Sequence, residues 1–86
     1  MYEIVFTKQA QKDKKLLMQA GLDKRAKALL DVIAENPFKN PPRYEKLVGD
    51  LAGYYSRRIN VQHRLVYQVY EELKTVKVLS MWAHYE

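Results

Sequence analysis

The 86-residue chain contains no cysteine, and this absence excludes several kinds of chemistry. Without cysteine there are no disulfide bonds, no thiolate metal sites and no thiol nucleophile. Only two histidines are present, His63 and His84, so a dedicated zinc site would have to recruit carboxylates. We therefore expect neither a bound metal nor another cofactor.

Catalytic motifs and membrane or export signals are also missing. The sequence has no glycine-rich phosphate loop and no HExxH motif, so nucleotide hydrolysis and zinc proteolysis have no support. No apolar run approaches the roughly 18 residues that cross a bilayer. The first residues lack the basic and apolar regions of a signal peptide. We expect a cytoplasmic protein without membrane contact.

Basic residues, in contrast, are in excess. Fifteen Lys and Arg stand against ten Asp and Glu, which gives a formal net charge of +5. Residues 39–64 hold six basic and two acidic residues, so most of the net charge lies in this stretch. A concentrated positive surface is typical of proteins that bind nucleic acid. A solvated, charged strand edge gives the same pattern, and charge alone leaves both interpretations open.

The hydrophobic pattern predicts one α+β domain over residues 1–86. The expected elements are a strand over residues 1–6, helices over 8–20 and 23–35, and strands over 44–48, 54–59, 63–70 and 75–83. Thr7 and Asp23 are suitable N-caps, Gly21 follows the first helix, and Asn36-Pro37 ends the second.

The order of these elements predicts a helical hairpin packed on one face of a twisted, mostly antiparallel sheet. The first strand must join this sheet at long range, and the face without helices is free to bind a partner. Because strand side chains alternate, we expect Arg57 and Arg58 on opposite faces.

Four residues have the chemistry for cutting RNA without a metal. Such cleavage needs a base for the 2′-OH, cations for the phosphate and an acid for the leaving oxygen. Glu45 can be the base, Arg58 and Arg64 the cations and His84 the acid. Each also has a structural interpretation, as a surface ion-pair partner or a chain end. For His63 we expect a structural role.

Longer motifs favour the catalytic interpretation of these residues. The chain contains YEKL at 44–47, LAGYYSRRI at 51–59, HRLVY at 63–67 and AHY at 83–85. Together they closely resemble the YoeB/Txe toxins, members of the RelE superfamily of bacterial type II toxin–antitoxin modules. The SRRI and HRLVY segments combined with a terminal His-Tyr are highly specific. The first half of the chain matches only in architecture.

The resemblance implies a RelE-like, microbial-RNase-like fold and a role for each matching residue. Glu45 corresponds to the general base and His84 to the general acid of the family. Arg64 corresponds to the arginine that stabilises the phosphate, Arg58 supports it, and Tyr85 positions the substrate. The neighbouring basic residues that we expect to contact RNA are Arg43, Lys46 and Arg57. One departure is Val48, where many family members have a lysine.

The resemblance also implies partners. Family members act on 70S ribosomes, where they cut messenger RNA in the A site and so inhibit translation. A YefM/Axe-type antitoxin holds them inactive and supplies the contacts to operator DNA. A toxin homodimer is also expected. Two alternatives on the same fold are not catalytic: a ParE-like toxin that binds DNA gyrase, and an RNA-binding module that only blocks the ribosome.

Overall fold

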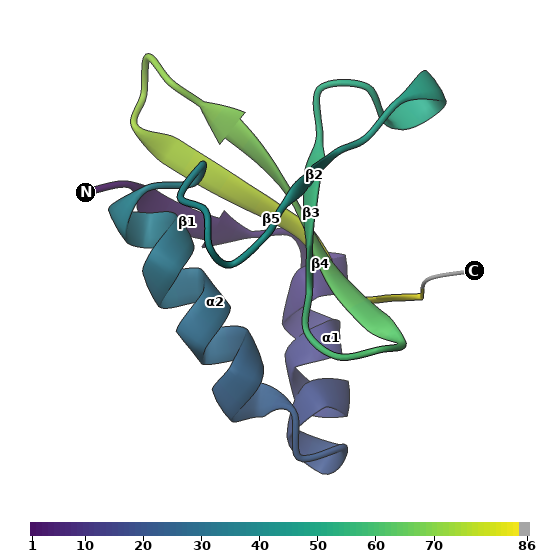
Figure 1. Cartoon of the computed structure of the whole chain (residues 1–86). Coiled ribbons are helices and arrows are strands. Elements are labelled where there is room, and N and C mark those ends of the chain that lie inside the picture. Colours follow the sequence, from purple (N-terminus) through teal and green to yellow (C-terminus); the bar gives the residue numbers. More distant parts are fainter. Residues whose placement is uncertain (85–86) are drawn as a thin grey trace.

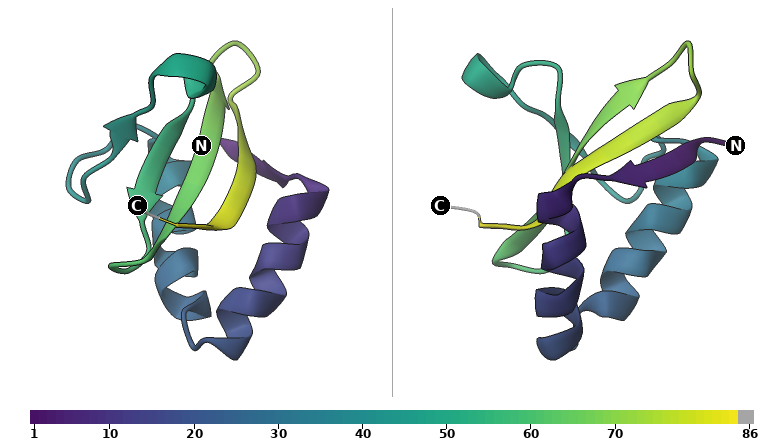
Figure 2. Two further views of the ribbon diagram at one scale, coloured as in Figure 1. Left: turned by 90° about the vertical axis from the view of Figure 1, so that its right-hand side faces the viewer. Right: turned by 180° about the vertical axis from the view of Figure 1, so that it is seen from behind.

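A computed structural model describes residues 1–84, in which five strands form a single sheet (Figures 1 and 2). In chain order the elements are β1 (Glu3–Phe6), α1 (Lys8–Gln19), α2 (Asp23–Glu35), β2 (Glu45–Lys46), a 3-10 turn (Gly49–Leu51), β3 (Tyr55–Arg58), β4 (His63–Tyr70) and β5 (Thr75–His84). The strand order is β1-β5-β4-β3-β2, and among these strands β1 and β5 are the parallel pair. The predicted α+β class and mostly antiparallel sheet are therefore confirmed.

Strand β1 joins the sheet at long range, as its place in the sequence requires. It pairs with the far end of the chain, from Glu3 opposite Thr75 to Phe6 opposite Val78. A backbone hydrogen bond of 2.7 Å from Tyr2 N–H to the carbonyl of Ala34 also ties it to the end of α2. Strand β1 therefore forms one edge of the sheet, beside the last strand of the chain.

Three of the four predicted helix start and stop signals are confirmed. The Thr7 hydroxyl oxygen accepts a hydrogen bond from the N–H of Ala10, and Gly21 follows α1 with a positive φ of 72°. The fourth expectation, that Asp23 caps α2, is wrong. Leu22 occupies the cap position without a side-chain hydrogen bond. Leu22 packs against the core, which leaves Asp23 inside the first turn of the helix.

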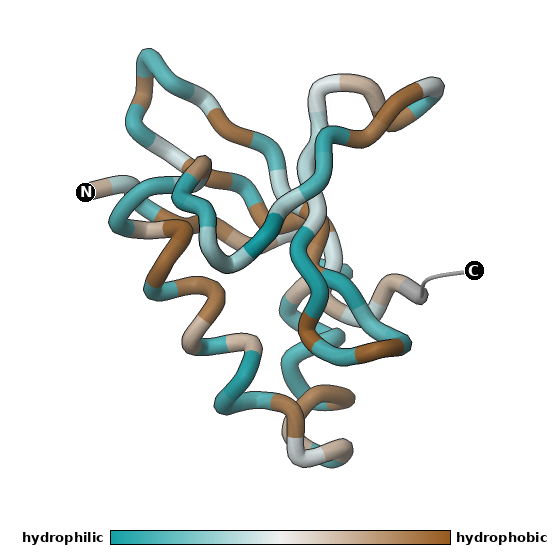
Figure 3. Tube along the Cα trace, viewed as in Figure 1, coloured by the Kyte–Doolittle hydropathy of each residue, from teal (hydrophilic) through white to brown (hydrophobic). Residues whose placement is uncertain are grey.

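Both helices cover one face of the sheet with residues spaced at helical periods (Figures 1 and 3). The buried residues are Ala10, Asp13 and Leu17 on α1, and Ala26, Leu29 and Ile33 on α2. They pack against Leu65, Tyr67, Val76, Val78 and Met81 of the two central strands. In the described part of the chain, neither helix is long and apolar enough to cross a membrane.

Strand β5 is irregular where it passes the first helix. Opposite Arg64, Val66 and Tyr67 its partners are Ala83, Ser80 and Val78, so β5 contains extra, bulged residues. The N–H of Met81 in this segment donates to the carboxylate of Asp13, 2.9 Å away on α1. Asp13 is 1% exposed and also accepts a hydrogen bond of 2.9 Å from Gln9. A tertiary contact therefore stabilises the bulge.

Candidate active site

The strand register gathers polar side chains on the face of the sheet away from the helices. On β3, Arg57 is buried toward the core, and Ser56 and Arg58 alternate with it. Glu45 of β2 lies directly opposite Ser56, and Arg64 of β4 lies directly opposite Arg58. Because directly opposite residues share a face, these four residues belong to one surface.

A cavity of about 290 Å³ opens on this surface. Its lining residues are Pro42, Arg43, Glu45, Ser56 and Arg58. The structure thus brings together three predicted site residues that are up to 15 positions apart in the sequence. Glu45 is half-buried, whereas Arg43 and Arg58 are exposed. A carboxylate beside two guanidinium groups can accept a proton while the cations hold an anion.

Arg64 extends the positive charge of this cavity. It is half-buried and lies across the strand pair from Arg58. Like charges placed directly opposite each other on neighbouring strands cost free energy. An anion between them offsets this cost, and a phosphate matches the fork of guanidinium donors.

The structure describes the predicted site residues at the end of the chain, His84 and Tyr85, only in part. The backbone of His84 ends β5, where it pairs opposite His63. The side chain of His84 and all of Tyr85 lie outside the described residues, so their roles stay predictions. His63 itself is buried and stacks on Trp82, with 3.9 Å between ring centroids, in line with the structural role expected of it.

Two of the expected RNA contacts do not lie in the cavity. Arg57 is 1% exposed and its guanidinium donates to backbone carbonyls, so it has no surface with which to meet RNA. The prediction for Arg57 is wrong, because strand alternation turns this side chain toward the core. Lys46 is exposed opposite Tyr55 and is not among the lining residues. Val48, the departure from the family pattern, is 84% exposed and is not a lining residue either.

Ser56 is a lining residue that sequence reasoning missed. Its hydroxyl is fully buried and makes no hydrogen bond to the residues that the structure describes. We expect Ser56→Ala to leave the free energy of unfolding unchanged or to raise it by up to about 1 kcal/mol, because it removes a desolvated group without a partner. Urea unfolding measures this change.

The matched control for Ser56→Ala is Thr7→Ala. The Thr7 hydroxyl caps α1 and donates to the carbonyl of Leu79 at 2.7 Å. Its loss is expected to cost about 1 kcal/mol. A loss of the same size in Ser56→Ala would contradict the assignment of its hydroxyl as unsatisfied.

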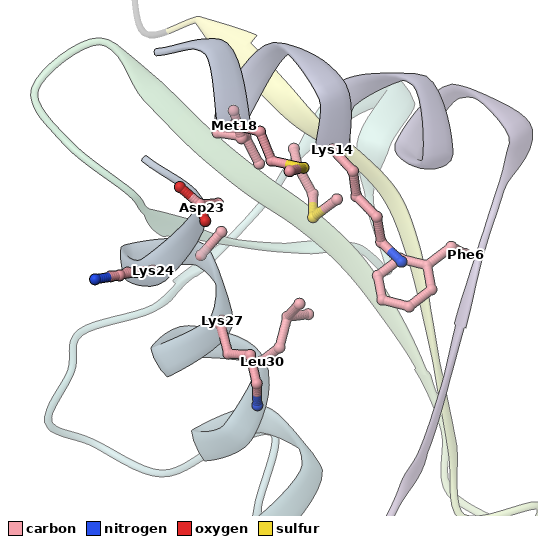
Figure 4. A pocket seen from close by; sticks show the side chains of 10 residues that line it. Phe6, Lys14, Met18, Asp23, Lys24, Lys27 and Leu30 are labelled. Atoms are coloured by element: carbon pink, nitrogen blue, oxygen red, sulfur yellow. The ribbon is translucent and has the colours of Figure 1, made fainter. Parts of the chain in front are cut away.

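A second, larger cavity of about 400 Å³ lies between the two helices and the sheet (Figure 4). Its walls are mainly apolar, from residues such as Leu17, Met18 and Leu30, with Lys14 over the ring of Phe6 at 3.8 Å. Asp23, Lys24 and Lys27 also belong to its lining, but none of the residues predicted to act on RNA lines it. Among the described side chains, those of residues 1–83, no three His, Asp or Glu gather as metal ligands.

Comparison of the sequence with known families gives one match over nearly the whole chain. Residues 6–85 match the YoeB-like toxins of bacterial type II toxin–antitoxin systems. Toxin YoeB of Synechocystis sp. is 41% identical over 76 residues, which are 88% of this chain and 79% of that protein. The family match over residues 6–85 includes every candidate site residue.

Solved structures agree with the sequence comparison. Toxin YoeB of Staphylococcus aureus is 39% identical, both in a heterotetrameric complex with the antitoxin YefM (TM-score 0.81) and as a dimer (0.82). The alignments cover 99% of both chains for the complex and 98% for the dimer. A YoeB/ParE toxin from Agrobacterium tumefaciens is 30% identical with a TM-score of 0.86, over 96% of this chain and 99% of the other.

Proposed function

The chain belongs to the YoeB-like toxin family of bacterial type II toxin–antitoxin systems, and from this we propose that it is a ribosome-dependent endoribonuclease. It cuts messenger RNA in the A site without a metal ion and thereby inhibits translation in the cytoplasm. The observation that carries the proposal is the cavity that Arg43, Glu45 and Arg58 line together, with Arg64 opposite Arg58. A base beside several phosphate-binding cations is what this reaction needs.

In the proposed reaction Glu45 takes the proton of the 2′-OH next to the scissile phosphate. The 2′-oxygen forms a bond to phosphorus, and the bond from phosphorus to the 5′-oxygen breaks. Arg58 and Arg64 stabilise the charge that develops on the phosphate oxygens. His84 donates a proton to the leaving 5′-oxygen, Tyr85 positions the substrate, and the product is a 2′,3′-cyclic phosphate.

The ribosome supplies the geometry that this small protein lacks. The in-line attack needs the 2′-OH, the phosphorus and the leaving oxygen in one orientation, and such orientation contributes many orders of magnitude in rate. A net charge of +5 supports docking on ribosomal RNA. Free messenger is therefore cut poorly.

The proposed partner is a YefM/Axe-type antitoxin. The Staphylococcus aureus toxin, which is 39% identical, has been solved in complex with YefM and as a dimer. We propose the same partner and a homodimer for this chain, with operator DNA contacted through the antitoxin. An acidic antitoxin segment that covers the arginines around Glu45 accounts for the inhibition.

The test is primer extension on a defined messenger that is either free or programmed into 70S ribosomes. The expected result is a new 5′ end in the A-site codon with ribosomes, and little or no cleavage of the free messenger. Added antitoxin is expected to abolish the new end.

Two outcomes contradict the proposal. Growth arrest on expression with no cleaved messenger, but with protein bound to ribosomes, indicates a module that blocks translation. Growth arrest with neither cleavage nor ribosome binding favours a ParE-like toxin that binds DNA gyrase. The supercoiling activity of gyrase is then measured in the presence of the purified protein.

A further inference from the structure

The loop between α2 and β2 has few hydrogen-bond donors of its own. Residues 37–42 contain all three prolines of the chain, and a proline has no backbone N–H. The N–H groups of Phe38 and Lys39 both donate to Asn36, at 2.9 and 3.1 Å. Carbonyl groups of this loop therefore need donors from elsewhere, because buried carbonyls are normally paired.

One buried arginine supplies these donors. The guanidinium of Arg57 donates from Nη2 to the carbonyls of Pro37 (3.0 Å) and Lys39 (2.9 Å), and from Nη1 to that of Pro42 (2.6 Å). Its Nε donates to the hydroxyl of Tyr67 at 3.1 Å. Arg57 thus makes four hydrogen bonds and reaches both ends of the loop.

The side chain of Arg57 is closed off from water and lies close to aromatic rings. Tyr67 is fully buried, and its hydroxyl donates to the carbonyl of Pro37 at 2.8 Å. Burial raises the pKa of this hydroxyl, although the hydrogen bond and charge of Arg57 act against the rise. The rings of Phe38, Tyr44 and Tyr55 pack against one another, with centroids 5.2 to 6.0 Å apart, and the ring of Tyr55 lies 5.7 Å from that of Tyr67. The guanidinium itself lies 5.2 Å from the ring centroid of Tyr44.

The loop held in this way leads directly into the candidate site. Pro42, whose carbonyl accepts the shortest of these bonds, lines the cavity, as do Arg43 and Glu45 just after it. We propose that Arg57 is a positioning residue: it holds loop 37–42 from the core side of the sheet and thereby sets Arg43 and Glu45 in the cavity on the other side. In its catalytic part this inference rests on the proposed function.

Lysine is the informative replacement for Arg57, because it retains the positive charge but lacks the planar guanidinium group. A planar guanidinium presents donors in several fixed directions, whereas an ammonium is a single point with three donors. In Arg57→Lys one ammonium cannot reach Pro37, Lys39 and Pro42 together. The loop then opens more often, and Glu45 meets the 2′-OH in the correct position less often.

The experiment combines two measurements on the whole protein. Amide hydrogen exchange of residues 38–45 is expected to be about tenfold faster or more in Arg57→Lys, since those amides lose a shared anchor. On programmed ribosomes, kcat for messenger cleavage is expected to fall about 10- to 100-fold. The concentration of ribosomes at half-maximal rate stays within about twofold, because Arg57 does not touch RNA.

Two controls separate this role from others. Arg58→Lys, on the same strand but in the cavity, is expected to slow cleavage without changing the exchange of residues 38–45. Arg25→Lys, exposed on α2, is expected to change neither. If Arg57→Lys unfolds, Tyr67→Phe removes one donor to Pro37 and is expected to show the same changes in weaker form.

Three results overturn the inference. The first is unchanged exchange of residues 38–45 in Arg57→Lys. The second is a loosened loop with undiminished kcat, and the third is ribosome binding that weakens in step with cleavage. If the wild-type protein cuts no messenger, the proposed function fails and the catalytic part of the inference fails with it. Hydrogen exchange then still decides whether Arg57 holds the loop.

Discussion

Replacing Glu45 by glutamine is expected to lower the rate of messenger cleavage about 10²- to 10⁴-fold, the range that a general base contributes. Glutamine has nearly the same shape as glutamate but cannot take the proton of the 2′-OH. Glu45 is half-buried in a cavity with Arg43 and Arg58, so the carboxylate is held beside the cations that bind the phosphate. Single-turnover cleavage on programmed ribosomes measures the effect.

Ribosome affinity must be measured on the same variant. Removing a negative charge from a positive cavity is expected to leave binding to RNA unchanged or slightly stronger. The control is Asp50→Asn, an exposed acid of the 3-10 turn that does not line the cavity. If the Glu45→Gln variant cleaves at the wild-type rate, Glu45 is not the general base of the reaction.

The second large effect concerns stability and the irregular part of β5. Asp13→Ala is expected to lower the free energy of unfolding by about 2–4 kcal/mol, because it leaves a buried N–H without a partner and opens a small cavity. The carboxylate of Asp13 is 1% exposed and accepts hydrogen bonds from Met81 N–H and Gln9. Urea unfolding and the exchange rate of the Met81 amide measure the change.

Asp31→Ala is the matched control for this prediction. Asp31 forms a salt bridge of 2.9 Å with Lys27 on the surface of α2, and its side chain is 67% exposed. Exposed pairs of this kind contribute little, so the expected loss is below about 0.5 kcal/mol. Equal stability of the two variants would show that the Met81 N–H finds another partner when Asp13 is absent.

The helices and the long strands were predictable because their signals are local. Hydrophobic spacing marks the buried face of α2 at Ala26, Leu29 and Ile33, and β4 runs over His63–Tyr70 as the sequence predicts. Strand β2 was predicted over five residues and has two, since the chain turns into Gly49–Leu51 just beyond it. Edge strands receive hydrogen bonds from one side only, and a local pattern carries little information about their length.

By itself the sequence determined the fold class, the positive charge of one stretch and three of the residues that line the cavity, Arg43, Glu45 and Arg58. Those properties depend on residue types and on short spacings, which can be read without coordinates. Only the tertiary structure decided the side on which each arginine acts. Arg57 and Arg58 are adjacent in sequence, yet one holds a proline-rich loop from inside and the other lines a cavity. Strand alternation separates them, and the packing of the two helices on one face of the sheet determines which face is the core.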